Sequence, residues 1–152
     1  MSYIDRNLVP DEQILFRTRK HKIIFFYPML LTVALFFIIP YMLHNFILIR
    51  VVWVPFVVVS IFWAYTLLEY VTSEFAVTNK RVMMREGFFV RHTNETRLNA
   101  IARVNVDQSI VGQLLNFGTV SLNAFGAFDV FPLIARPLEF QKYVNVELDR
   151  QR

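Results

Sequence analysis

The sequence contains two long apolar runs that carry no Asp, Glu, Lys or Arg. They occupy residues 23–44 and 51–68, and only the short segment 45–50 separates them. The hydrocarbon core of a bilayer requires about 20 apolar residues in a helix, so each run is long enough to span it. Because backbone amides find no water partners in lipid, each run is predicted to be an α-helix. The two helices are therefore expected to form a transmembrane hairpin.

This hairpin divides the 152-residue chain into three predicted parts. Residues 1–22 form a cytoplasmic N-terminal segment, which is too short for a hydrophobic core of its own. Residues 23–69 form the transmembrane hairpin, and residues 70–152 are long enough for one small folded domain. The N-terminal residues lack the basic region and short apolar core of a cleaved signal peptide, so the first helix is expected to be an uncleaved anchor.

Basic residues are concentrated on one side of the predicted hairpin. They stand before the first helix and after the second, at Arg17, Arg19, Lys20, Lys22, Lys80, Arg81 and Arg85. The loop between the helices offers only Arg50. Because basic residues near helix ends stay in the cytoplasm, the pattern predicts a multi-pass membrane protein with both termini cytoplasmic. This topology also explains the net charge of +4, so no nucleic-acid partner is expected.

The hydrophobic period changes after the second apolar run. Apolar and polar residues alternate in segments 71–78, 82–85, 102–107, 119–124 and 129–134, and residues 13–16 could form a further strand before the hairpin. Short alternating strands joined by tight turns indicate an antiparallel meander with one face in a core. Residues 109–117 suit a short helix with Ser109 as its cap and Gly118 as its stop, and an amphipathic helix is predicted from Pro137 onward. The predicted fold class is α+β: a small antiparallel β-barrel or sandwich, capped by a C-terminal helix and attached to a membrane α-helical hairpin.

This layout and two local motifs resemble one protein family. The motifs are the Thr-Asn-Lys-Arg turn at 78–81 and the stretch Gln-Ser…Leu-Leu-x-x-Gly-Thr-Val between residues 108 and 120. With the preceding helical hairpin, they resemble the membrane-anchored bacterial pleckstrin-homology (PH)-like domain proteins of the two-transmembrane-helix type. The resemblance covers nearly the whole chain and implies a PH-like fold. It brings no catalytic residues with it, because fold alone does not determine function.

No constellation of residues in the sequence indicates an enzyme. The chain has no cysteine, which excludes thiol catalysis and cysteine-type zinc sites. Its histidines, His21, His44 and His92, lie in different regions and none has a partner at metal-ligand spacing. No close pair of carboxylates stands in an apolar setting suited to acid–base chemistry. We therefore expect no catalytic activity, no metal and no cofactor.

Recognition of anionic lipid headgroups is one of two binding functions that remain open. Eukaryotic PH domains that bind phosphoinositides use a basic cluster around the first strand turn, and the resemblance implies the same position here. The candidate residues are Lys80, Arg81, Arg85 and Arg103. Their charges could cradle a phosphate, or they could simply solvate the outer face of the sheet.

Protein assembly is the other binding function, and it is the preferred one. The candidate residues are Ile110, Leu114, Leu115, Phe117, Phe125 and Phe128. Some apolar residues of segment 110–117 are expected in the core, but so short a helix cannot easily bury all of them, so the surplus suggests contact with lipid or another subunit. Phe125 and Phe128 could insert into an apolar partner or fold back over the barrel end, and the second interpretation is preferred.

Together with the resemblance, which implies a location in the bacterial inner membrane, these observations predict a membrane-anchored binding or scaffold protein that organises or joins a membrane protein complex. Its expected partners are membrane lipids and either further copies of itself or another membrane protein. The alternative is a headgroup-recognition module that uses the basic turn at Lys80, Arg81 and Arg85.

Overall fold

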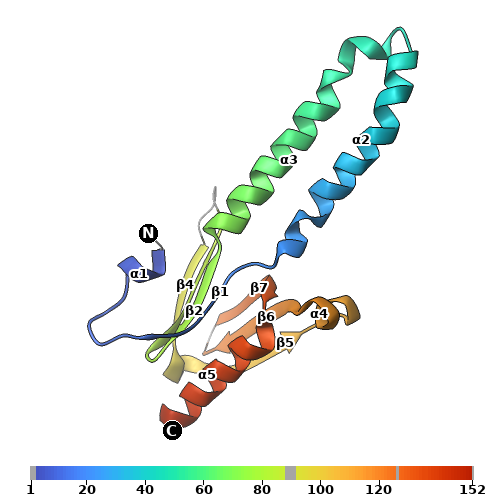
Figure 1. Cartoon of the computed structure of the whole chain (residues 1–152). Helices are drawn as coiled ribbons and strands as arrows, with labels where there is room; N and C mark the ends of the chain where they lie inside the picture. Colours follow the sequence, from blue (N-terminus) through green and yellow to red (C-terminus); the bar gives the residue numbers. More distant parts are fainter. Residues whose placement is uncertain (1–2, 88–91, 126, 152) are drawn as a thin grey trace.

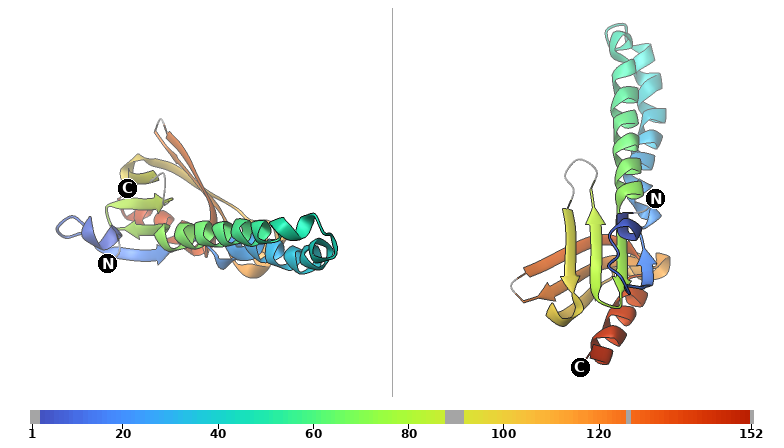
Figure 2. Two further views of the ribbon diagram at one scale, coloured as in Figure 1. Left: turned by 90° about the horizontal axis from the view of Figure 1, so that it is seen from above. Right: turned by 90° about the vertical axis from the view of Figure 1, so that its left-hand side faces the viewer.

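The computed structural model describes residues 3–87, 92–125 and 127–151. Two antiparallel sheets and a C-terminal helix form a small α+β domain, and a pair of long helices projects from one end of it (Figures 1 and 2). The C-terminus and the turn between β2 and β3 lie at the opposite end of the domain (Figure 1).

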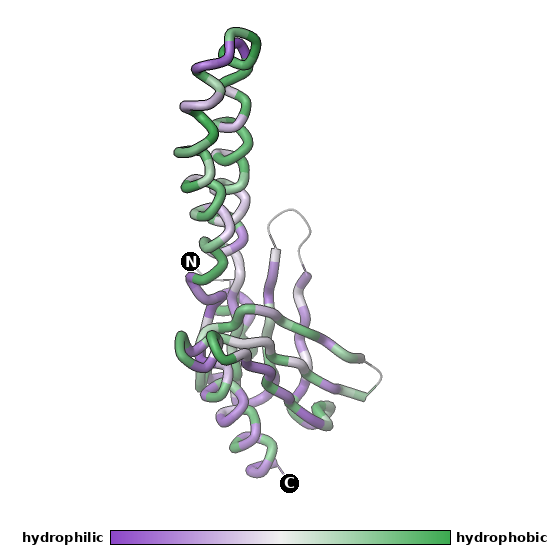
Figure 3. The backbone as a smooth tube through the Cα atoms, turned by 90° about the vertical axis from the view of Figure 1, so that its right-hand side faces the viewer, coloured by the Kyte–Doolittle hydropathy of each residue, from purple (hydrophilic) through white to green (hydrophobic). Residues whose placement is uncertain are grey.

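The projecting pair consists of α2 (Phe26–His44) and α3 (Trp53–Thr72), with short 3-10 turns before each, η1 (Lys22–Phe25) and η2 (Leu48–Val51). With their 3-10 turns, both helices are long and apolar enough to cross a membrane by length and composition. Most of their apolar side chains face outward, and Figure 3 shows the hydrophobic character along most of the pair. An exposed apolar surface of this extent is unusual for a protein surrounded by water.

Aromatic contacts join the two helices near their bases. The rings of Phe25 and Trp63 stack with centroids 5.8 Å apart, and Phe25 also lies 5.3 Å from the ring of Tyr70. The indole nitrogen of Trp63 donates a hydrogen bond of 3.0 Å to the hydroxyl of Thr32. These contacts keep the lower halves of α2 and α3 side by side.

The first sheet brings together residues from both sides of the helix pair. Its strands, in spatial order, are β1 (Ile14–Thr18), β2 (Glu74–Thr78), β3 (Arg81–Glu86) and β4 (His92–Arg97). Strand β1 pairs with β2, with Phe16 opposite Val77. The predicted division into a separate segment 1–22 and a domain 70–152 therefore needs correction, because N-terminal residues supply an edge strand of the sheet. The helix pair is an insertion between β1 and β2.

The second sheet consists of β5 (Ile101–Asp107), β6 (Phe117–Ala124) and β7 (Ala127–Ala135). The chain just beyond β1 joins this sheet to the first one. His21 donates a backbone hydrogen bond of 2.6 Å to Leu133, Ala135 donates one of 3.0 Å to Arg19, and Lys20 forms an isolated bridge with Ile134. Residues 19–21 thus connect the two sheets directly below the helix pair.

One core lies between the two sheets and α5 (Pro137–Gln151). Its largest fully buried side chains include Phe75 from the first sheet, Leu122 from the second and Phe140 from α5. A second small cluster covers the outer face of the first sheet, where Ile4 of α1 (Tyr3–Arg6) packs against Met83. Because both faces are covered, every residue of β2 is buried, whereas its alternating sequence predicted a half-buried strand.

Several element boundaries differ from the sequence prediction. The strand predicted over 71–78 begins only at Glu74, because α3 continues to Thr72. The short helix α4 (Ile110–Leu115) is capped by Ser109 as predicted, but its C-cap is Asn116 in the left-handed region rather than Gly118. The predicted beginning of a strand at Phe88 lies outside the described residues, which resume at His92. A 3-10 turn, η3 (Leu98–Ala100), connects the two sheets.

A buried ion pair fixes the end of the first sheet that lies far from the helix pair. The Glu12 carboxylate accepts hydrogen bonds of 3.0 and 2.9 Å from the Arg81 guanidinium, 2.7 Å from the Thr78 hydroxyl and 2.9 Å from the Val9 backbone. Burial raises the pKa of Glu12, but these hydrogen bonds and the charge of Arg81 outweigh it and leave the pKa below its ordinary value. Glu12 is therefore ionised in the folded protein at neutral pH.

Replacing Arg81 with alanine is expected to destabilise the domain by about 3 kcal/mol, because it leaves the buried Glu12 carboxylate without its counter-charge. Thermal unfolding in detergent micelles measures the change. The matched variant Arg103→Ala removes an exposed guanidinium and should leave the melting temperature nearly unchanged. Equal melting temperatures for the two variants would contradict a structural role for the pair.

Candidate functional site

The four predicted headgroup residues do not come together in the structure. Lys80 and Arg81 lie at the turn between β2 and β3, at the end of the domain away from the helix pair (Figure 1). Arg85 lies toward the other end of β3, and Arg103 is exposed on β5 in the second sheet. The turn, the end of β3 and the second sheet are thus three separate places.

Three of these cations also have contacts within the chain. Arg81 binds Glu12 and donates a further hydrogen bond of 2.6 Å to Glu95. Lys80 donates one of 2.9 Å to the carbonyl of Pro10. The Arg85 guanidinium lies 4.5 Å from the centre of the Tyr3 ring, in a cation–π contact. These contacts connect the N-terminal residues to the sheet and give the basic turn a structural role.

A different basic site lies where the helix pair meets the domain. A cavity of about 380 Å³ opens between the end of β1, the end of β7 and the last turn of α3. It is lined by five cationic side chains, those of Arg17, Arg19, Lys20, Lys22 and Arg136. No Asp or Glu is among the described residues that line it. Sequence reasoning assigned most of these residues to membrane topology and did not connect Arg136 with them.

Carboxylates around the cavity contact these cations, but some of the contacts are long. Arg17 lies 3.3 Å from Asp5, and Arg136 lies 3.4 Å from Glu139. The nearly buried Glu74 carboxylate pairs with Arg17, and it lies 3.9 Å from the Arg19 guanidinium, which is longer than a hydrogen bond. Half of the Arg19 side chain and half of the Arg136 side chain remain exposed. The cavity therefore presents partly exposed guanidinium groups to solvent, although the contacting carboxylates equal the lining cations in number.

Lys20 is the buried member of this cluster, and its side chain connects α3 with β3. Its ammonium group lies 2.5 Å from the Glu69 carboxylate near the end of α3 and also contacts Glu86 at the end of β3. Burial lowers the pKa of Lys20, but the hydrogen bonds and charges of the two carboxylates outweigh it, so the pKa is raised above its ordinary value. Lys20 is charged at any physiological pH and joins the base of the helix pair to the sheet.

His21 adds a neutral polar group next to the cavity. Its Nδ1 accepts a hydrogen bond of 3.1 Å from the Ile23 backbone, which caps the 3-10 turn η1 at the base of α2. Its ring stacks on Phe117 with centroids 5.2 Å apart. Burial, together with the charge of Lys22, lowers the pKa of His21. The imidazole is therefore neutral at pH 7 and acts as an acceptor.

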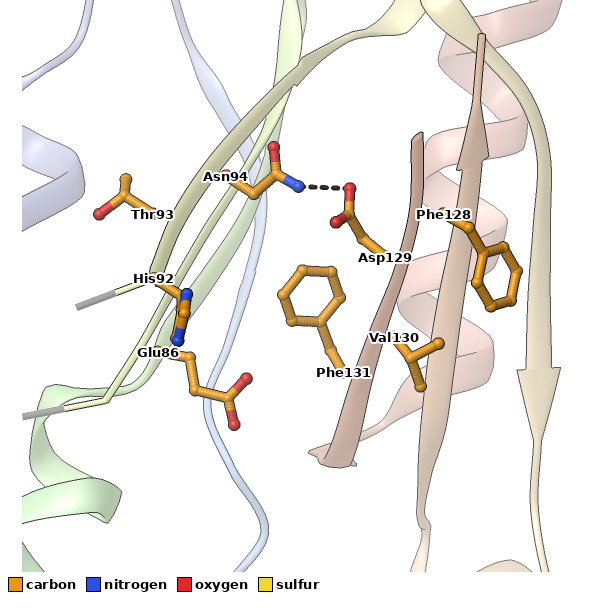
Figure 4. Close-up of a pocket in the computed structure, with 8 residues that line it drawn as sticks. All are labelled: Glu86, His92, Thr93, Asn94, Phe128, Asp129, Val130 and Phe131. Carbon is orange, nitrogen blue, oxygen red and sulfur yellow. Dashed lines mark hydrogen bonds between the residues drawn. The ribbon is translucent and has the colours of Figure 1, made fainter. Parts of the chain in front are cut away.

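A second pocket, of about 420 Å³, lies between the facing edges of β4 and β7 (Figure 4). Its acidic groups already have partners: Asp129 accepts a hydrogen bond from Asn94, and Glu86 pairs with Lys20. Within the described residues, no group of three or more His, Cys, Asp or Glu side chains could hold a metal ion. The pocket is therefore bounded by the edges of β4 and β7, and its two carboxylates are already paired.

The apolar residues of α4 form an exposed surface instead of joining the core. Ile110 and Leu114 are 87% and 84% exposed, and Val111 and Leu115 are also exposed. The expectation that some of segment 110–117 is buried among core residues is thus wrong for these four side chains. The reason is Gly112, the buried residue of α4: a Cβ there would lie 2.6 Å from the Phe117 carbonyl oxygen. The helix packs through its glycine, so its apolar side chains point outward.

The other predicted assembly residues are divided between two places. Phe117 is half-buried against His21 at the base of the helix pair. Phe125 and Phe128 are 83% and 64% exposed, so the interpretation that they fold back over the barrel end is wrong. The β6–β7 hairpin that carries them extends past β4 (Figure 2), where none of the described elements covers them.

Comparison with known proteins identifies a family. The family model described as bacterial PH domain matches residues 30–147. Among solved structures, the chain is similar to a DUF1696 family protein with a pleckstrin-homology domain from Shewanella loihica PV-4. The identity is 11%, the TM-score is 0.49, and the match covers 95% of this chain and 89% of that one. A search of curated proteins finds no match.

The environment of His21 predicts a pH-dependent stability. Because its pKa is lower in the folded than in the unfolded chain, the unfolded chain binds the proton more readily, and stability should fall as the pH decreases below about 6.5. The variant His21→Asn keeps a hydrogen-bond acceptor without a titrating group, so its melting temperature should fall less between pH 7.5 and about pH 5.5. A matched variant, His92→Asn, changes an exposed histidine on β4 and should behave as the wild type. If His21→Asn shows the wild-type pH dependence, the capping role of the neutral imidazole is contradicted.

Proposed function

Because the chain belongs to the bacterial PH domain family, we propose that it is a membrane-anchored binding and scaffold protein rather than an enzyme. PH-like domains commonly bind lipids or proteins. In this proposal, α2 and α3 span the bacterial inner membrane, both termini are cytoplasmic, and the domain organises or joins a membrane protein complex.

The helix pair supports the membrane part of the proposal. Its two candidate spans, Lys22–His44 and Leu48–Thr72, contain few charged residues and have outward-facing apolar side chains. Arg17, Arg19 and Lys20 stand at the domain end of the pair, which agrees with a cytoplasmic domain under the positive-inside rule. At the opposite end of the pair, the only Lys or Arg in the connecting segment 45–50 is Arg50.

The observation that carries the proposal is the insertion of the helix pair between β1 and β2. Both strands are hydrogen-bonded members of the first sheet, and each lies within a few residues of a helix base. A domain attached by two such short connections cannot move far from its anchor. Its end below the helices, with α4 beside it, would therefore face the membrane surface permanently.

The exposed surface of α4 supports association with other proteins. Ile110 and Leu114 are among the most exposed apolar side chains of the domain, and no described element covers them. Apolar surface of this kind commonly marks an interaction site. Association of several copies, or with another membrane protein, would bury it.

Headgroup recognition by the turn at Lys80, Arg81 and Arg85 is the weaker alternative. Arg81 is paired with Glu12 and Glu95, and Lys80 is bonded to the Pro10 carbonyl. Lys80 and Arg81 also lie at the end of the domain away from the helix pair (Figure 1), so a membrane around those helices would be out of their reach, and Arg85 lies at the other end of β3. Both facts disfavour a headgroup site at this turn.

Native mass spectrometry of the full chain, extracted from its own membranes in mild detergent, tests the assembly role. We expect discrete multiples of 18.0 kDa or an added protein mass. The variant Leu114→Gln should shift the distribution to the monomer, because it places an amide on the exposed face of α4. The matched variant Val146→Gln, on the exposed side of α5, should leave the assembly intact. A wild-type chain found only as a bare monomer would contradict the scaffold role.

A further inference from the structure

We propose that the cavity at the base of the helix pair binds the phosphate group of an anionic membrane lipid. This inference rests on the proposed function, because it requires α2 and α3 to lie in a bilayer. It moves headgroup recognition away from the turn at Lys80 and Arg81, to a place that the sequence pattern alone did not distinguish.

The charge of the cavity suits a phosphate. Arg17, Arg19, Lys22 and Arg136 line it, whereas Lys20 is buried and already paired with both Glu69 and Glu86. The facing carboxylates are Glu74, Asp5 and Glu139; Glu74 lies 3.9 Å from Arg19, and Glu139 lies 3.4 Å from Arg136. Arginine donors in a planar fork match phosphate oxygens, and the contacts of Arg19 and Arg136 to these carboxylates are long enough to be exchanged for a phosphate.

The position of the cavity suits a lipid rather than an anion in solution. One wall is Tyr70 in the last turn of α3, and another is Lys22 at the beginning of η1, so the cavity lies where the apolar helices begin. If these helices span a bilayer, the lipid phosphates lie at the same level. A lipid bound there would place its acyl chains along the exposed apolar faces of α2 and α3.

The neighbouring helix α4 extends this membrane-facing surface. The Asn116 carbonyl at its C-cap accepts a backbone hydrogen bond of 3.0 Å from Arg136, and Phe117 stacks on His21. The cavity and the apolar side chains of α4 are therefore adjacent. Apolar and cationic groups that occur together next to a helix base are typical of contact with the interfacial region of an anionic bilayer.

The test measures lipid retention by the purified full chain in mixed micelles that contain equal amounts of dioleoyl phosphatidylglycerol and dioleoyl phosphatidylcholine. Native mass spectrometry counts the bound lipids. We expect the wild type to retain phosphatidylglycerol preferentially, and the variant Arg19→Gln/Arg136→Gln to lose that preference by about tenfold. The variant Arg97→Gln/Lys142→Gln removes the same charge at exposed positions outside the cavity and should retain it.

Two additional samples separate the other outcomes. Arg19→Lys/Arg136→Lys keeps the charge and should restore most of the preference, which separates a lost charge from a misfolded domain. An excess of glycerol phosphate supplies a phosphate ester without acyl chains. If it displaces the phosphatidylglycerol completely, the cavity binds a soluble anion and the lipid assignment is overturned. Equal lipid preference in the cavity variant and its control also overturns it.

Carbonate extraction of the same membranes distinguishes this inference from the proposed function. If the wild-type chain is released by carbonate, the helices do not anchor it and the proposed function fails. If the chain stays in the membrane but shows no preference for phosphatidylglycerol, only the inference about the cavity fails.

Discussion

Strands β1 and β2 pair edge to edge although the whole helix pair lies between them in the chain. Paired strands are about 4.8 Å apart, so the end of β1 and the beginning of β2 hold the two helix bases close together. Lys20 strengthens this junction, because its buried ammonium group requires the carboxylates of Glu69 and Glu86 beside it. The contacts between Phe25 and Trp63 then continue the junction into the helices.

This junction determines which surface of the domain faces the helix side. Residues 19–21 also pair with the end of β7, so the second sheet is held in the same arrangement. The basic cavity and α4 consequently lie at the helix bases, while the Glu12–Arg81 pair and the end of α5 lie away from them (Figure 1). In the proposed membrane orientation, the two ends of the domain have different roles: one contacts lipid and partners, and the other maintains the fold.

Local patterns in the sequence predicted much of this fold. The two apolar runs, the alternating strands and the Ser109 cap depend on neighbouring residues, and the structure contains the corresponding elements. The pairing of β1 with β2 depends on residues about 60 positions apart, and the contacts of Glu12 with Arg81 join residues 69 positions apart. The sequence did not reveal the cavity, because Arg136 follows the last strand and is far in sequence from Arg19. In addition, the positive-inside rule already explained the basic residues before the first membrane helix. The outward face of α4 depends on the close approach of Gly112 to β6, which no periodicity reveals.

The central claim is that the end of the domain carrying α4 faces the bilayer, and the depth of two spin labels tests it most directly. The chain has no cysteine, so Leu114→Cys and Asp149→Cys can each carry one nitroxide label in the full chain reconstituted into phosphatidylglycerol–phosphatidylcholine vesicles. Power-saturation electron paramagnetic resonance compares the accessibility of each label to oxygen, which dissolves in the bilayer, and to a water-soluble nickel chelate. The account predicts that the label at residue 114 is more accessible to oxygen, and the label at residue 149 to nickel. Two labels with the same aqueous profile, or a reversed order, would contradict it.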